Sequence, residues 1–244
     1  MLFFALVDLV FPADCAGCDR PGEGLICARC RAVLAELRPV AARPTPAPPG
    51  LPGCVAVGSY DGALRDWLLA YKERGAHRLA VPLGAALARA VTAAVGDPRQ
   101  PVALVAIPST FAAARQRHGD HMARMTRHAV RQIRATGRPA VLVPALRACP
   151  KADSSHLDAA ARARAAASAF RVRSRSAGRL ATVQRAGAAV VLVDDIVTTG
   201  ATLAAAADVL ALAGVRVCAA ATIAATVRRS VGTSHLLRVS ESAR

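Results

Sequence analysis

Four cysteines near the N-terminus have the spacing of a metal site. Cys15, Cys18, Cys27 and Cys30 form a C-x2-C-x8-C-x2-C pattern. Each C-x-x-C pair can wrap one edge of a metal ion in a tight turn, and two pairs complete a tetrahedral thiolate site. Because four thiolates leave no open position, we expect a structural zinc ion and not a catalytic one. The alternatives are two disulfides or four free thiols.

A second group of residues that could do chemistry lies near residue 190. In VVLVDDIVTTGATL (190–203), an apolar run leads into Asp194 and Asp195, and a loop rich in Thr and Gly follows. Carboxylates at the carboxyl end of a buried strand lie where ligands bind in open α/β sheets. The loop opens a helix near Ala201, so its N–H groups and hydroxyls form a receptor for a phosphate dianion. The acids then face neighbouring hydroxyls, which predicts a ligand such as a ribose 5-phosphate.

Each part of this segment also has an ordinary structural interpretation. Thr199 or Thr202 could cap a helix, Gly200 could serve a turn, and the acid pair could bind Mg²⁺ as in receiver-like domains. The ordered combination is more specific than its parts, because the apolar run, the acids, the loop and the helix onset agree. The chain contains neither G-x-G-x-x-G nor G-x4-G-K-[ST], which argues against dinucleotide and P-loop nucleotide sites.

Alternating strand and helix patterns must position these residues. Apolar runs predict buried strands at 54–60, 102–107, 140–146, 189–195 and 215–225. Helical spacing occurs at 64–71, 76–95, 118–135, 156–168 and 201–213. This alternation predicts an α/β fold with a mostly parallel sheet covered by helices on both faces. A chain of 244 residues, 54% of them hydrophobic, is long enough for one such domain and a small appendage.

The composition changes sharply after residue 37. Residues 38–53 hold six prolines, which predicts a semi-rigid linker that separates two hydrophobic cores. We therefore expect a four-cysteine zinc module at 1–37, the linker at 38–53, the α/β domain at 54–230 and a frayed tail at 231–244.

The charge of the chain is strongly positive. The formal net charge is +16, and of the 32 basic residues only Lys72 and Lys151 are lysines. Guanidinium groups match phosphate oxygens, so the charge implies an anionic partner, either nucleic acid or a phosphorylated small molecule. Residues 159–193 are the densest stretch, without any acid and with seven arginines: Arg162, Arg164, Arg171, Arg173, Arg175, Arg179 and Arg185. Contact with nucleic acid and a solvated loop both fit this stretch.

The cysteine content and the N-terminus bear on the compartment. Seven cysteines, four of them clustered, do not form the framework of a disulfide-rich domain. The N-terminus MLFFALVDLVFPADC has an apolar start, but it lacks the basic region of an export signal. No uninterrupted apolar stretch reaches the length of a membrane span. We therefore expect a cytoplasmic protein.

Several segments resemble a known family. VVLVDDIVTTGATL closely resembles the 5-phosphoribosyl 1-diphosphate (PRPP) signature of type I phosphoribosyltransferases. With the four-cysteine start and the linker, the whole chain is similar to the ComF family of competence-associated proteins. Residues 59–84 resemble that family's first helical block, and residues 106–125 resemble the segment after its second core strand.

The resemblance implies a site for PRPP and Mg²⁺. It places the candidate catalytic residues Asp194 and Asp195 on the ribose hydroxyls, with Mg²⁺ bridging ribose and pyrophosphate. The resemblance also implies that the 5-phosphate is surrounded by the loop residues Thr198, Thr199, Gly200, Ala201 and Thr202. By position, it assigns four residues to the pyrophosphate loop: Ser109, Thr110, Arg115 and Arg117. The chain departs from the family at Arg117–His121, where His118 and His121 could face phosphate or the surface, and at 153–165, on the acceptor side.

The sequence leaves two functions open. The first is a Mg²⁺-dependent phosphoribosyltransferase, linked through its family to DNA uptake, in which pyrophosphate leaves C1 through an oxocarbenium-like state. The second is a non-catalytic adaptor that keeps the PRPP pocket and binds single-stranded DNA or a DNA-uptake helicase. A pocket for the acceptor would distinguish them, but no residue pattern identifies one.

Overall fold

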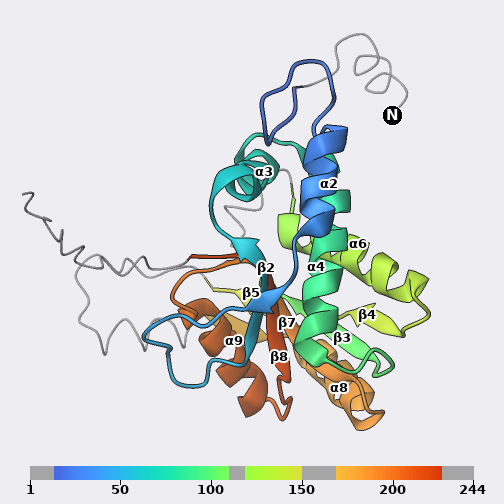
Figure 1. Cartoon of the computed structure of the whole chain (residues 1–244). Helices are drawn as coiled ribbons and strands as arrows, with labels where there is room; N and C mark the ends of the chain where they lie inside the picture. The colour runs from blue at the N-terminus through green and yellow to red at the C-terminus, as the bar shows by residue number, and fades with distance from the viewer. Residues whose placement is uncertain (1–13, 110–118, 150–168, 227–244) are drawn as a thin grey trace, which may run out of the picture.

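The computed structural model describes residues 14–109, 119–149 and 169–226 (Figure 1). Within them, six strands form one sheet in the order β1-β2-β8-β7-β3-β4. The bounds of these strands are Val40–Ala41 (β1), Cys54–Ser59 (β2), Ala219–Ala225 (β8), Ala189–Val197 (β7), Val102–Ala106 (β3) and Ala140–Leu142 (β4). Two short strands, β5 (Leu146–Ala148) and β6 (Phe170–Val172), pair as a separate antiparallel ribbon.

The large sheet is parallel except at one edge. Only β1 runs antiparallel to its neighbour, β2. The carboxyl ends of β2, β8, β7 and β3 therefore meet at the same edge of the sheet. In the register, Asp194 of β7 lies opposite Thr222 of β8, and Val193 lies opposite Ala106 of β3. Because β7 is an inner strand, its acids reach this edge between two neighbouring strands.

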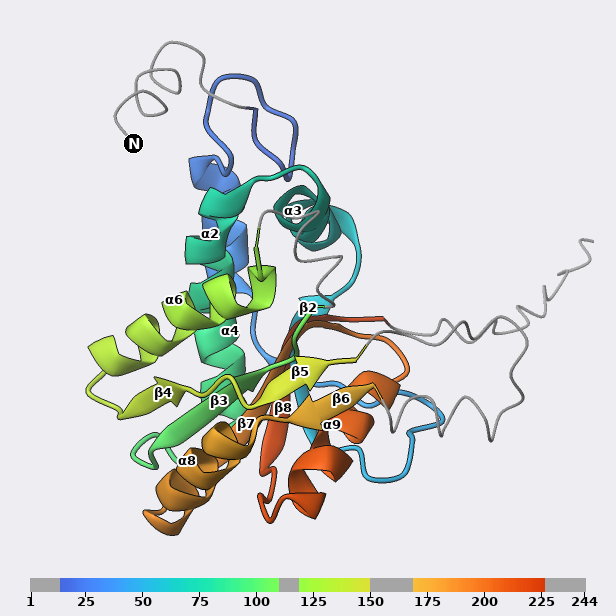
Figure 2. The same ribbon diagram turned by 180° about the vertical axis from the view of Figure 1, so that it is seen from behind.

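Helices cover both faces of the sheet (Figures 1 and 2). One face carries α2 (Ala28–Glu36), α3 (Gly62–Glu73), the 3-10 helix η1 (His77–Leu79), α4 (Ala80–Val95) and α6 (His121–Ala135), and the other carries α8 (Ser174–Arg185) and α9 (Ala201–Leu212). The side chains of β7 alternate between two hydrophobic cores, with Val191 and Val193 in the first and Val190 and Leu192 in the second. The predicted α/β fold is thus confirmed.

Some elements differ from the sequence-based expectation. Strand β7 continues to Val197, two residues beyond the acids. The predicted strand at 140–146 is divided into β4 and β5 around Pro144, which has no N–H to donate to a ladder. Helix α6 begins at His121 and not at residue 118, because the Asp120 carboxylate caps it by accepting a hydrogen bond from Ala123 N at 2.9 Å. The helix predicted at 156–168 lies outside the described residues.

The proline-rich segment 38–53 lies against the large sheet. Its residues Val40–Ala41 form the edge strand β1. A Cβ on Gly200 would lie 2.9 Å from a methyl group of Leu51 and 3.4 Å from Pro44, so this segment also approaches the start of α9 closely. The expected domain boundaries stay a prediction, but parts of the segment contact the fold, through β1 and near the start of α9.

The four-cysteine unit shares a core with the α/β domain. Cys15, Cys27 and Cys30 belong to the same buried cluster as Trp67 of α3. A Cβ on Gly17 would collide with the indole of Trp67, so only glycine permits this contact. The expectation that the linker separates two cores is therefore wrong, because the unit buries its apolar side chains against α3 and α4.

Among the described residues, one helical stretch is long and apolar enough to cross a membrane. Residues His77–Val95 have a mean hydropathy of 1.4, and half of the stretch is buried. Its side chains Leu83, Leu87 and Val91 are 0% exposed and pack in the first hydrophobic core. Packing of this kind is typical of a core helix in a globular domain.

Candidate functional site

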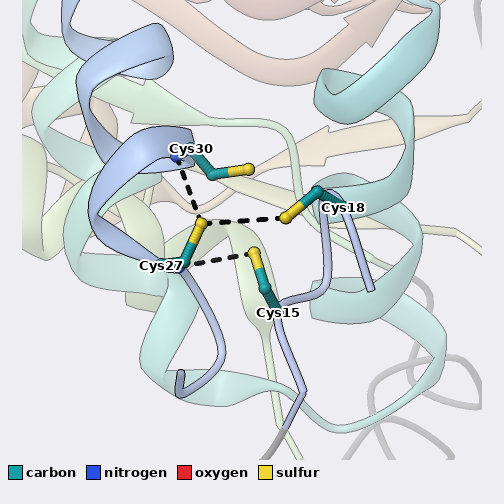
Figure 3. A group of neighbouring side chains, drawn as sticks. All are labelled: Cys15, Cys18, Cys27 and Cys30. Atoms are coloured by element: carbon teal, nitrogen blue, oxygen red, sulfur yellow. Dashed lines mark hydrogen bonds between the residues drawn. The ribbon is translucent and has the colours of Figure 1, made fainter. Parts of the chain in front are cut away.

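The four predicted cysteine ligands converge on one point (Figure 3). Their Sγ atoms all lie within 4.8 Å of one another, and those of Cys18 and Cys27 are 3.7 Å apart. Cys27 caps α2 and Cys30 lies in its first turn, so the helix start positions the second pair. The backbone N–H of Cys27 donates to the sulfur of Cys15 at 3.3 Å, and that of Cys30 donates to the sulfur of Cys27 at 3.4 Å.

This cluster could hold a metal ion. Burial would raise the pKa of Cys15, but backbone N–H groups of Cys27, Gly17 and Cys18 outweigh it and lower the pKa to about 6. The thiolate is the form that binds metals, so these donors prepare the sulfur for coordination. Four sulfur donors are a preferred set for Zn²⁺. All four cysteines are free thiols in the structure, which argues against the disulfide alternative.

The acid pair divides between the two faces of the sheet. Consecutive side chains of a strand point in opposite directions, and Asp195 shares the face of Val191 and Val193. Its Oδ2 lies 2.5 Å from Lys72 Nζ and 3.0 Å from His121 Nε2. Asp195 is 6% exposed, so this carboxylate is buried with both donors on one oxygen.

His121 connects Asp195 to two further elements. Its Nδ1 lies 3.2 Å from Oγ of Ser109, the residue that follows β3 by three positions. Its backbone carbonyl accepts a hydrogen bond of 2.6 Å from the hydroxyl of Tyr71 on α3. A chain of polar contacts therefore joins Ser109, His121, Asp195 and Lys72 across α3, α6, β7 and the end of β3.

The two acids have opposite electrostatic environments. Burial would raise the pKa of Asp195, but the hydrogen bond from His121 and the charge and hydrogen bond of Lys72 bring it below its ordinary value. Burial and the charge of Asp195 raise the pKa of Asp194 well above its ordinary range. The pair is therefore asymmetric, with one stabilised carboxylate and one that holds its proton more firmly.

The predicted phosphate loop follows β7 directly. Gly200 caps α9 with a φ of 77°, a left-handed conformation that favours glycine. The Ala201 N–H lies 3.4 Å from the hydroxyl of Thr199, and the side chains of Thr198 and Thr199 are exposed. A cavity of about 760 Å³ adjoins the loop, between these threonines and the proline-rich segment.

The structure brings most of the predicted site residues to one edge of the sheet. Ser109, the acid pair and the loop all lie at the carboxyl ends of β3 and β7. Thr202 is exposed in the first turn of α9. Three predicted pyrophosphate-loop residues lie outside the described residues: Thr110, Arg115 and Arg117.

Sequence reasoning missed the partners of Asp195. His121 was expected to face phosphate or the surface, but it is 5% exposed and bonded to a carboxylate. Tyr71 lies in the helix predicted at 64–71, but the helical spacing does not indicate that its hydroxyl donates to His121. Lys72 carried a signal that could have found it, because it is one of only two lysines in the chain.

Comparison with known proteins adds a family to this geometry. A model described as the phosphoribosyl transferase domain matches residues 75–239, which is more than half of the chain. The chain belongs to this family. The phosphoribosyl transferase match includes the acid pair, the loop, His121 and Ser109, and the mostly parallel sheet is typical of the type I fold. No curated protein matches the chain. The four-cysteine cluster and Lys72 precede the matched residues of the phosphoribosyl transferase domain.

The shared core predicts that the cysteine cluster supports the whole phosphoribosyl transferase fold. Elemental analysis should find one zinc ion per chain in the wild type and none in Cys18→Ser. The melting temperature of this variant should fall by about 5 °C or more, because a bound metal ion would fix side chains that pack in the same core as Trp67. Cys218→Ser is the control, since Cys218 is exposed and outside the cluster, and it should retain zinc and stability. Less than stoichiometric zinc in the wild type would contradict the assignment.

The asymmetry of the acids predicts opposite effects on stability. Asp195→Asn should destabilise the protein by about 3 kcal/mol, because it leaves Lys72 without its buried counter-charge. Asp194→Asn should instead stabilise the protein at neutral pH. The pKa of Asp194 is higher in the folded protein than in the unfolded chain. Proton binding by this carboxyl therefore favours folding below the unfolded pKa, and this contribution to stability is lost as the pH rises through the folded pKa. Denaturant unfolding between pH 4 and about 9 tests both variants, and equal effects would contradict the asymmetry.

Proposed function

We propose that this protein binds PRPP together with Mg²⁺ and transfers its phosphoribosyl group to an acceptor. The observation that carries the proposal is the placement of Asp194, Asp195 and the Thr198–Thr202 loop at the carboxyl end of one inner strand, within the matched phosphoribosyl transferase domain. Ligands of open α/β sheets bind at this edge.

The proposed binding mode uses the two chemistries of this edge. The 5-phosphate lies against the backbone N–H groups and hydroxyls of the loop, where the start of α9 adds a partial positive charge. The ribose hydroxyls donate hydrogen bonds to the acids. Ser109 lies at the end of the neighbouring strand, on the side where the pyrophosphate would extend. Mg²⁺, when bound with PRPP, would offset the charge of the pyrophosphate.

The proposed reaction is a substitution at C1 of the ribose. The bond between C1 and the pyrophosphate oxygen breaks, and its electron pair leaves with pyrophosphate. A lone pair of the acceptor forms the new bond to C1, and the proton that the attacking atom carried is released to water. The acids hold the ribose so that C1 faces both groups, which lowers the entropic part of the barrier.

Three narrower proposals accompany this one. The four-cysteine cluster binds Zn²⁺ as a structural ion, which its four converging sulfurs support. The chain belongs to the ComF family and serves DNA uptake, which the four-cysteine unit beside a phosphoribosyl transferase domain supports. The protein works in the cytoplasm, which its free thiols support.

A specific observation also favours the second function, an adaptor for single-stranded DNA. Arg147 of β5 and Arg171 of β6 lie directly opposite each other in the antiparallel ribbon. Like charges in such a pair repel, so an anion between them would be stabilising. Together with Arg173, they line a hollow of about 430 Å³. This group of arginines fits a phosphodiester backbone.

Calorimetry with PRPP tests the first function. The wild type should bind PRPP with Mg²⁺ and lose most of the affinity without it, because without the metal ion the charge of the pyrophosphate would not be offset beside the acid pair. The double variant Asp194→Ala, Asp195→Ala should bind at least about 100-fold more weakly. Thr199→Val should weaken binding about tenfold through the loss of one hydroxyl. Cys218→Ser serves as the control. A wild type that binds no PRPP with Mg²⁺ present would overturn the proposal.

Salt titration of DNA binding tests the second function. The affinity for single-stranded DNA should fall steeply with salt, and replacing Arg171, Arg173 and Arg175 by Ala should reduce the slope by about 0.7 for each lost phosphate contact. The matched control replaces exposed arginines of α2, Arg29 and Arg31, and should leave the slope unchanged. Binding that does not depend on salt, or absent binding at low salt, would exclude the adaptor function.

A further inference from the structure

Lys72 is a cation at the acid pair that no assigned role explains. Its Nζ contacts Asp195 Oδ2 at 2.5 Å, and its side chain is 19% exposed against 9% for that of Asp195. The carboxylate oxygen that it contacts also accepts from His121 Nε2 at 3.0 Å. Lys72 lies three residues before the range matched by the phosphoribosyl transferase domain.

The core fixes where Lys72 can reach. Helix α3 buries Leu64, Trp67, Leu68 and Tyr71, so the helix cannot rotate without breaking this packing. Tyr71, the residue before Lys72, also donates a hydrogen bond to the carbonyl of His121 at 2.6 Å. The end of α3 is therefore held against the start of α6 at the point where both donors of Asp195 originate.

The residue type at this position is informative. Lysine occurs only twice among the 32 basic residues of the chain, so its use at a buried ion pair departs from the general preference for arginine. An ammonium group is a compact charge, whereas a guanidinium group is a planar fork that takes both oxygens of a carboxylate. Because His121 occupies the same oxygen as Lys72, a compact cation fits this position better than a fork.

We propose that Lys72 is a positioning residue of the PRPP site, which holds Asp195 in place and offsets its charge. This inference rests on the proposed function. PRPP is an anion that must approach two adjacent carboxylates, and Lys72 cancels the charge of one of them before the ligand arrives. It also fixes the carboxylate by its contact, so that the oxygen is oriented when a ribose hydroxyl donates to it.

The charged groups that face Asp195 come from each element packed around it. Lys72 approaches from α3, His121 from α6, and Asp194 precedes it on β7. Removing the charge of Lys72 takes away one of the causes that lower the pKa of Asp195. Asp195 would then become protonated at a higher pH than in the wild type. The acid limb of the pH profile of ligand binding should therefore shift to higher pH.

Calorimetry of PRPP with Mg²⁺ from about pH 3 to 9 tests the proposal on three variants, because the lowered pKa of Asp195 places the acid limb of the wild type in the acidic range. Lys72→Met keeps the length of the side chain without its charge, and should weaken binding about tenfold or more and move the acid limb to higher pH. Lys72→Arg keeps the charge, and should leave the limb in place while weakening binding through its shape. Arg65→Met on the exposed side of α3 is the control and should bind as the wild type does.

The outcomes separate the two proposals. A wild type that does not bind PRPP overturns the proposed function and this inference with it. A wild type that binds, with Lys72→Met matching it in affinity and pH dependence, overturns the role of Lys72 alone. If Lys72→Arg binds PRPP as tightly as the wild type does, the argument that this position requires a compact cation is overturned. If Lys72→Met does not fold, Lys72→Gln and Lys72→Arg are compared, and an unchanged acid limb in Lys72→Gln overturns the inference.

Discussion

The inner position of β7 is the constraint on which the site depends. Its residues Val190–Val193 are 0% exposed, and they face two different cores between β8 and β3. Fully burying such side chains contributes about 1.5–3 kcal/mol each. This burial fixes the register of the strand, and the register carries Asp194 and Asp195 to the ligand edge although both carboxyls lose hydration there. A slip of one residue would exchange the faces of all these side chains.

Alternation along β7 also explains why the two acids are not equivalent. Asp195 faces the side where α3 and α6 supply a lysine and a histidine, whereas burial and the neighbouring charge disfavour ionisation of Asp194. Functional sites commonly keep groups that stability alone would not select. The arrangement of helices thus decides which carboxylate is compensated, and the strand decides only that both arrive at the edge.

The sequence predicts local patterns well and distant contacts poorly. The apolar runs predicted five of the six strands of the large sheet, and the Asp-Asp and Thr-Thr-Gly order predicted that the acids and the loop follow one strand, because these signals lie within a few residues. It did not predict that Lys72 and His121, 49 positions apart, meet at Asp195, since this meeting depends on how α3 and α6 pack. It did not predict that Val40 and Ala41, within the proline-rich segment, pair with β2 as an edge strand.

The net charge of the chain and the charged groups of the site have different effects on ligand binding. A net charge of +16 attracts anions from a distance and does not distinguish among them. At the acid pair, Lys72 provides a positive charge among the described residues. The loop that follows β7 presents hydroxyl and N–H groups. In the proposed binding mode, the acids beside the Thr198–Thr202 loop favour an anion that also brings hydroxyl donors and a metal ion. Under the proposed function, the acids would select a ribose phosphate, whereas the arginines attract every phosphate.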